Sequence, residues 1–140
     1  MRILALDLGR RRVGIAISDP SGTLARPHST LDVVAGNMLS RVTAAIDRLA
    51  AEDDGVSRIV VGLPRHLDGT AHTQTEAVLS FVAALREQVS IPIVTEDERL
   101  TSREAEGRLA LREKDWRKRK ALLDAAAAAV ILQDHLDRAR

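Results

Sequence analysis

The chain has 140 residues, of which 45% are hydrophobic and 29% charged, with 21 Lys and Arg against 20 Asp and Glu. This balance predicts one globular domain over residues 1–140 and excludes a disordered or fibrous chain. The lack of cysteine excludes a disulfide framework, a thiolate metal site and a cysteine nucleophile. No signal-peptide core and no apolar run of about 18 residues occur, so we expect a cytoplasmic protein without a membrane partner.

Aromatic residues are scarce: they make up 1% of the chain, as Phe81 and Trp116, and tyrosine is absent. Proteins that bind single-stranded nucleic acid usually stack bases on aromatic side chains. The net charge of +1 also gives no overall attraction to a polyanion. Any nucleic-acid binding must therefore depend on where the charges lie, and we expect recognition of backbone and shape rather than of bases.

The first thirty residues read as an antiparallel meander. Three β-prone segments follow one another, at Arg2–Leu8, Val13–Ser18 and about Thr23–Thr30. Gly9–Arg12 and Asp19–Gly22 supply the turns between them. Pro27 has no backbone N–H to donate, which predicts that the third strand lies at a sheet edge.

The rest of the chain alternates helices and strands. An apolar stripe of period 3.6 predicts a helix from an Asn37 cap to about Leu49. A buried strand is expected at Arg58–Gly62, followed by a helix from the capping box Thr73–Glu76 to about Glu87. A further strand is expected at Val89–Thr95. Two helices follow, one opened by the capping box Thr101–Glu104 and a last one containing Leu122–Leu136. This order predicts an α/β fold: a five-stranded mixed sheet, three strands antiparallel and then two parallel, flanked by helices.

Acidic residues recur where this topology would gather them. Asp7 ends the first strand, Asp97 and Glu98 follow the fifth, and Asp124 shares a helix face with Ala128 and Ile131. Carboxylates are the ligands that Mg²⁺ and Mn²⁺ prefer. Two such ions would activate water and stabilise the leaving oxygen of a phosphodiester displacement. The pattern therefore predicts a metal-dependent site, with Asp7, Asp97, Glu98 and Asp124 as catalytic candidates.

Each of these acids also has a purely structural interpretation. Asp7 can accept turn hydrogen bonds at a strand end. The acids around Asp97 repel one another unless a cation or Arg99 compensates them, and a solvated loop before a helix is the structural alternative. Asp124 can be a first-turn acid stabilised by the helix dipole.

Basic residues are concentrated beside the acids. Arg10, Arg11 and Arg12 fill the first turn, and Arg117, Lys118, Arg119 and Lys120 precede Asp124. They are candidates for binding substrate phosphates, although a solvated charged surface has the same composition. Gly62, at the end of the fourth strand, is a candidate backbone-phosphate contact, or a requirement of the loop that follows. The four histidines lack ligand spacing, so we assign none to a metal.

Four segments also carry a family resemblance: Leu6–Gly9 with Arg11, Val13–Ala16, Ser18 and Asp19; Val61–Pro64 with Asp68 and Gly69; Asp97–Ser102; and Lys120 and Asp124 with Ala127, Ala128 and Ile131–Gln133. They resemble the YqgF/RuvX family, described as bacterial pre-16S rRNA nucleases and as Holliday junction resolvases. The resemblance implies an RNase H-like fold and a metal-dependent nuclease site at Asp7, Asp124 and one acid of the Asp97–Glu98 pair, of which we favour Glu98.

The expected function is therefore a divalent-metal-dependent nuclease, with processing of the 5′ end of pre-16S rRNA as the task that the resemblance implies. Asp7, Glu98 and Asp124 would hold two Mg²⁺ or Mn²⁺ ions. Flanking phosphates would bind to Arg10, Arg11, Arg12, Gly62, Arg99, Arg117, Lys118 and Lys120. The alternatives are a Holliday junction resolvase acting on branched DNA, which would require a homodimer rather than a monomer, and a non-catalytic nucleic-acid-binding module.

Overall fold

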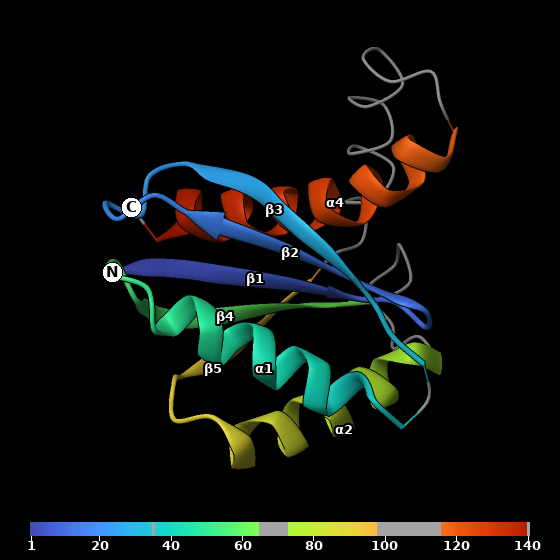
Figure 1. Ribbon diagram of the computed structural model, residues 1–140. Helices are drawn as coiled ribbons and strands as arrows, with labels where there is room; N and C mark the ends of the chain where they lie inside the picture. Colours follow the sequence, from blue (N-terminus) through green and yellow to red (C-terminus); the bar gives the residue numbers. More distant parts are fainter. Residues whose placement is uncertain (35, 65–72, 98–115, 140) are drawn as a thin grey trace.

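The computed structural model describes residues 1–34, 36–64, 73–97 and 116–139 (Figure 1). Its strands are β1 (Arg2–Leu8), β2 (Arg12–Ser18), β3 (Ala25–Asp32), β4 (Val56–Leu63) and β5 (Ile93–Asp97). Its helices are α1 (Met38–Ala50), α2 (Thr73–Gln88) and α4 (Trp116–Arg138). None of the helices in these ranges combines the length and apolar character that a membrane-spanning segment requires.

The five strands form one mixed sheet in the order β3-β2-β1-β4-β5. β1, β2 and β3 pair antiparallel, whereas β4 runs parallel to both β1 and β5. The predicted architecture is confirmed, and Pro27 lies on the edge strand β3 as expected. The register of β2 and β3 shifts between Ile15 and Ala16, next to the pairing of Ala16 with Pro27, as expected where a residue cannot donate to the ladder.

The two faces of the sheet are covered by different helices (Figure 1). Leu4 and Leu6 of β1 belong to a core cluster that includes apolar side chains of α1 and α2. Ala5, between them, belongs to a second cluster with Ala128 and Ile131 of α4. Because side chains alternate along a strand, even-numbered residues of β1 face α1 and α2, and odd-numbered residues face α4.

Several element boundaries differ from the predictions. β5 begins at Ile93 rather than Val89, because the Val89 N–H continues the pattern of α2 by donating to Leu85 O at 3.1 Å. Asn37 precedes α1 but makes no side-chain cap; its Oδ1 instead accepts the Val34 N–H at 2.8 Å. The segment Thr101–Glu104 and the helix expected from it lie outside the described residues.

The turn between β2 and β3 is closed by one carboxylate. Asp19 accepts a hydrogen bond from the Ser21 hydroxyl and, through Oδ1, from the backbone N–H groups of Thr23 and Leu24, each at 2.8 Å. These bonds, that from Ser21 foremost, hold the pKa of Asp19 well below its ordinary range. The charged carboxylate thus supplies the acceptors that orient the entry into β3.

Candidate active site

The backbone of Asp124 lies against Gly14, the residue opposite Asp7 at the end of β1. Asp7 is the register partner of Gly14 in the neighbouring strand β2. Helix α4 passes so close over Gly14 that a Cβ there would lie 1.9 Å from the backbone oxygen of Asp124. Gly14 therefore allows the helix that carries Asp124 to approach the strand pair that carries Asp7. Two acids that are 117 positions apart in the chain are thus brought to one edge of the sheet.

Strand alternation places Asp97 on the other face of the sheet from Asp7. Asp7 has the parity of Ala5, which packs under α4. Asp97 is the register partner of Leu63, which belongs to the α1 and α2 cluster. Asp97 therefore lies on the face of the sheet that packs against α1 and α2, opposite to the face of Asp7. Glu98, together with Arg99, lies outside the described residues.

Asp124 forms an ion pair with Arg12 across the β2–α4 interface. Arg12 Nε lies 2.8 Å from Asp124 Oδ2, with the two side chains 29% and 27% exposed. Asp124 lies beyond the first two turns of α4, which begins at Trp116. The helix dipole, which acts within the first turn, therefore does not account for this carboxylate. The ion pair with Arg12 accounts for the carboxylate, because the guanidinium compensates its negative charge at a half-buried position.

The other substrate-binding candidates belong to the turn after β1, to β4 and to the start of α4. Arg10 and Arg11 are exposed in the turn between β1 and β2, whereas Gly62 is buried near the end of β4. Arg117, Lys118 and Lys120 lie in the first turns of α4. The basic turn and the start of α4 thus both lie on the side of the molecule where β1 ends (Figure 1).

The described residues contain no group of three His, Cys, Asp or Glu side chains arranged to hold a metal ion. Asp7 and Asp124 are the two candidate ligands that the described residues bring to one face. Their oxygen donors match the preference of Mg²⁺ and Mn²⁺. A complete site requires a third ligand, and Glu98 is the predicted one.

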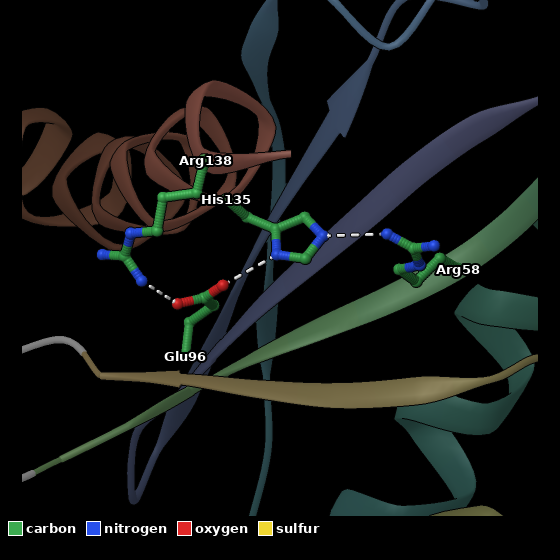
Figure 2. Close-up of polar contacts among 4 residues, drawn as sticks. All are labelled: Arg58, Glu96, His135 and Arg138. Atoms are coloured by element: carbon green, nitrogen blue, oxygen red, sulfur yellow. Dashed lines mark hydrogen bonds and ion pairs between the residues drawn. The ribbon is translucent and has the colours of Figure 1, made fainter. Parts of the chain in front are cut away.

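A second polar cluster connects the end of α4 with β4 and β5 (Figure 2). Glu96 of β5 lies 2.7 Å through Oε1 from His135 Nδ1 and is also paired with Arg138. Arg58 Nη1 of β4 lies 3.2 Å from His135 Nε2. Because a guanidinium can only donate, Nε2 accepts and Nδ1 carries the proton that is donated to Glu96. His135 thus bridges two strands from the end of the helix.

Replacing His135 by Ala should lower the free energy of unfolding by about 1 kcal/mol, because two hydrogen bonds to charged groups are lost at a partly solvated site. His135→Gln keeps one donor and one acceptor and should lose less. Urea denaturation measures both. Equal losses for the two variants would show that the ring's packing, and not its hydrogen bonds, holds the helix end.

Three features of this region are absent from the sequence-based set of site residues: Gly14, the pairing of Arg12 with Asp124, and the His135 bridge. Gly14 interrupts an apolar strand segment, and that signal of a close backbone approach could have found it. Arg12 was expected to bind phosphate, and its carboxylate partner lies too far away in the sequence to be inferred. His135 carries no local signal, since its partners Arg58 and Glu96 belong to other elements.

Comparison with known proteins decides the family. The model of the RuvX family, described as a Holliday junction resolvase, matches residues 1–138. The chain belongs to the RuvX family. A relative from Geobacillus kaustophilus is 42% identical with full coverage of both chains. One from Desulforamulus reducens is 39% identical over 98% of this chain and 97% of the relative. Both are named "Putative pre-16S rRNA nuclease".

Solved structures confirm the RNase H-like fold of this RuvX-family chain. The fowlpox virus resolvase in complex with Holliday junction DNA matches with a TM-score of 0.64 at 11% identity, covering 99% of each chain. RuvC of Thermus thermophilus, in complex with a Holliday junction substrate, matches with a TM-score of 0.55 at 13% identity, covering 99% of this chain and 95% of RuvC. At these identities the likeness concerns the fold alone.

Proposed function

We propose that this RuvX-family chain is a single-domain nuclease that depends on Mg²⁺ or Mn²⁺ and processes the 5′ end of pre-16S rRNA. The observation that carries the proposal is the convergence of Asp7 and Asp124 at the end of β1, across Gly14. The names of relatives at about 40% identity support the RNA substrate.

The ligand set that we propose is Asp7, Asp124 and Glu98. Asp97 pairs with Leu63 and so lies on the face away from Asp7, which argues against Asp97 as a ligand and in favour of Glu98. Two bound ions would supply an activated water and stabilise the leaving oxygen of the displaced phosphodiester. Asp7 and Asp124 would contribute negative charge and oxygen ligands, and Asp124 would share its carboxylate between the ion and Arg12, whose Nε lies 2.8 Å from its Oδ2.

The basic side chains of this edge would bind the substrate backbone. Arg10 and Arg11 are exposed in the turn that follows β1, and each guanidinium can bind a phosphate through two hydrogen bonds. Together with Gly62, Arg99, Arg117, Lys118 and Lys120, they would position the strand without reading its sequence. Their proposed role is therefore affinity and register, and that of the acids is hydrolysis.

The alternative substrate is branched DNA, which the family description favours. A Holliday junction resolvase must cut two strands symmetrically, so it would act as a homodimer. A non-catalytic binding module is the third possibility. Cleavage assays on a 5′-extended 16S rRNA fragment and on a four-way DNA junction, each with Mn²⁺ and with a chelator, separate the three.

We expect the RNA to be cleaved with Mn²⁺ and left intact with chelator. If the protein sediments as a dimer and cuts the junction symmetrically, the resolvase is favoured instead. Binding without cleavage of either substrate, in the presence or absence of Mn²⁺, would refute the nuclease.

Replacing Arg117 and Lys118 together by Ala should weaken binding of the RNA fragment. The plot of log K against log salt should become shallower, its slope falling in magnitude by about 1 to 2, because up to two phosphate contacts are lost. The slope is measured by fluorescence anisotropy at several salt concentrations. An exposed basic residue elsewhere, Arg48 on α1, provides the control Arg48→Ala. An unchanged slope in the double variant would remove these residues from the interface.

A further inference from the structure

An apolar pocket opens at the end of β1, on the opposite face of the sheet from Asp7. It has a volume of about 300 Å³. Among the described residues, its lining consists of Leu8–Arg10, Met38, Ala77, Val78 and Phe81. These residues come from the end of β1 and its turn, the first residue of α1, and α2, which lie together on one side of the sheet (Figure 1).

The pocket and the proposed active site share one strand end. Leu8 follows Asp7 directly, and because side chains alternate, the two point to opposite faces. Leu8 packs against the α1 and α2 cluster, and Arg10 stands in the turn where the two faces meet. A strand of nucleic acid whose phosphate lies at Asp7 therefore needs to pass only this turn to place a neighbouring nucleotide over the pocket.

The lining matches the chemistry of a nucleobase. Leu8, Met38, Val78 and Phe81 supply apolar walls, and Phe81 is the chain's single phenylalanine. Phe81 is only partly buried, so its ring is accessible from the pocket. The one charged side chain in the described lining is Arg10, which is complementary to the phosphate that accompanies a base. The volume lies at the lower end of the range for small-ligand sites, which suits one base and not a stack.

Although the scarcity of aromatic residues predicts recognition of backbone and shape, we propose that this pocket, termed the Phe81 pocket, binds one unpaired base of the substrate against Phe81, with Arg10 on the adjoining phosphate. The inference rests on the proposed nuclease function and specifies its substrate. A base within a duplex is paired and stacked and cannot enter, whereas a base in a single strand, loop or strand end can be splayed out and stacked on an aromatic side chain. The chain thus selects nucleic acid with an unpaired nucleotide beside the scissile phosphate.

The test compares binding of two RNA probes in the presence of chelator, so that no cleavage occurs. One probe is a short single strand carrying 2-aminopurine and the other is a fully paired duplex of the same length. Phe81→Leu, which keeps apolar volume but removes the π-face, should weaken binding of the single strand by about 5- to 100-fold. Binding of the duplex should change by less than about 2-fold, because backbone contacts are retained.

Two further variants keep the result interpretable. Ala77→Phe fills the pocket from an exposed position of α2 without removing a core side chain, and should reproduce the selective loss. Leu79→Ala, on the same helix but outside the described lining and 45% exposed, should bind both probes as the wild type does. The 2-aminopurine signal should change on binding to the wild type and not to Ala77→Phe.

Equal affinities of Phe81→Leu, Ala77→Phe and the wild type for the single strand would overturn the inference. So would an equal loss of affinity for both probes, which would indicate a structural role for the pocket. The nuclease proposal and the pocket proposal can fail independently. If the wild type cleaves RNA with Mn²⁺ while these variants bind the single strand normally, the nuclease function is retained and the pocket is rejected. Wild-type protein that binds neither probe would reject both.

Discussion

Asp7→Asn is expected to lower the rate of Mn²⁺-dependent RNA cleavage by about 1000-fold or more, because the substitution removes the charge of a proposed metal ligand while keeping the side-chain shape. Affinity for the RNA, measured by anisotropy in chelator, should change by less than about 3-fold. A loss confined to the cleavage step assigns Asp7 to chemistry. A loss confined to binding would place it in the substrate interface.

A matched control for this experiment is Asp47→Asn. Asp47 is an exposed carboxylate on α1, and its replacement should leave cleavage within about 2-fold of the wild type. Single-turnover rates at saturating protein separate the chemical step from binding and product release. Cleavage by Asp7→Asn at the wild-type rate would show that Asp7 has only a structural role near the end of β1.

Gly14→Ala is expected to reduce the free energy of unfolding by about 3 kcal/mol, because a single methyl group would overlap the backbone of α4. For a chain of this size the thermal midpoint should fall by about 10 °C. The helix can relieve the overlap only by moving away from β2, which displaces Asp124. Affinity for Mn²⁺ in the folded variant should therefore fall as well, measured at a temperature below its transition.

Ser57→Thr serves as the control for added volume. It also adds one methyl group to a strand, but at an exposed position of β4, and should change stability by less than about 0.5 kcal/mol. Wild-type stability of Gly14→Ala would contradict the close approach of α4 to β2.

The meander, the helices and the order of elements could be predicted from the sequence because each depends on local patterns. The turn residues Gly9 and Gly22 separate short β-prone segments, and the stripe from Met38 to Leu49 has period 3.6. The edge position of β3 followed from one residue, Pro27. Errors occurred where a local signal had two outcomes: Asn37 bonds backward to Val34 instead of capping α1.

The arrangement of the candidate site depended on contacts between distant segments, and these were only partly predictable. Strand ends and helix faces predicted that Asp7 and Asp124 lie at the same end of the sheet, and the backbone of Asp124 does lie against Gly14, the residue opposite Asp7. The face on which Asp97 lies required the register of β4 with β5, because a shift of one residue exchanges the faces. The assignment of Glu98 as a metal ligand stays a prediction. The ion pair of Arg12 with Asp124 joins residues that no local pattern connects, and the role of Glu96 as the partner of His135 is of the same kind.

Calorimetric titration with Mn²⁺ tests the central claim most directly, namely that Asp7 and Asp124 form one metal site at the end of β1. The wild type should bind Mn²⁺, and Asp7→Asn and Asp124→Asn should each weaken binding by at least about 10-fold, since either removes a charged ligand. Asp53→Asn, at an exposed acid before β4, should bind like the wild type. Equal Mn²⁺ affinity in all four proteins would contradict the account.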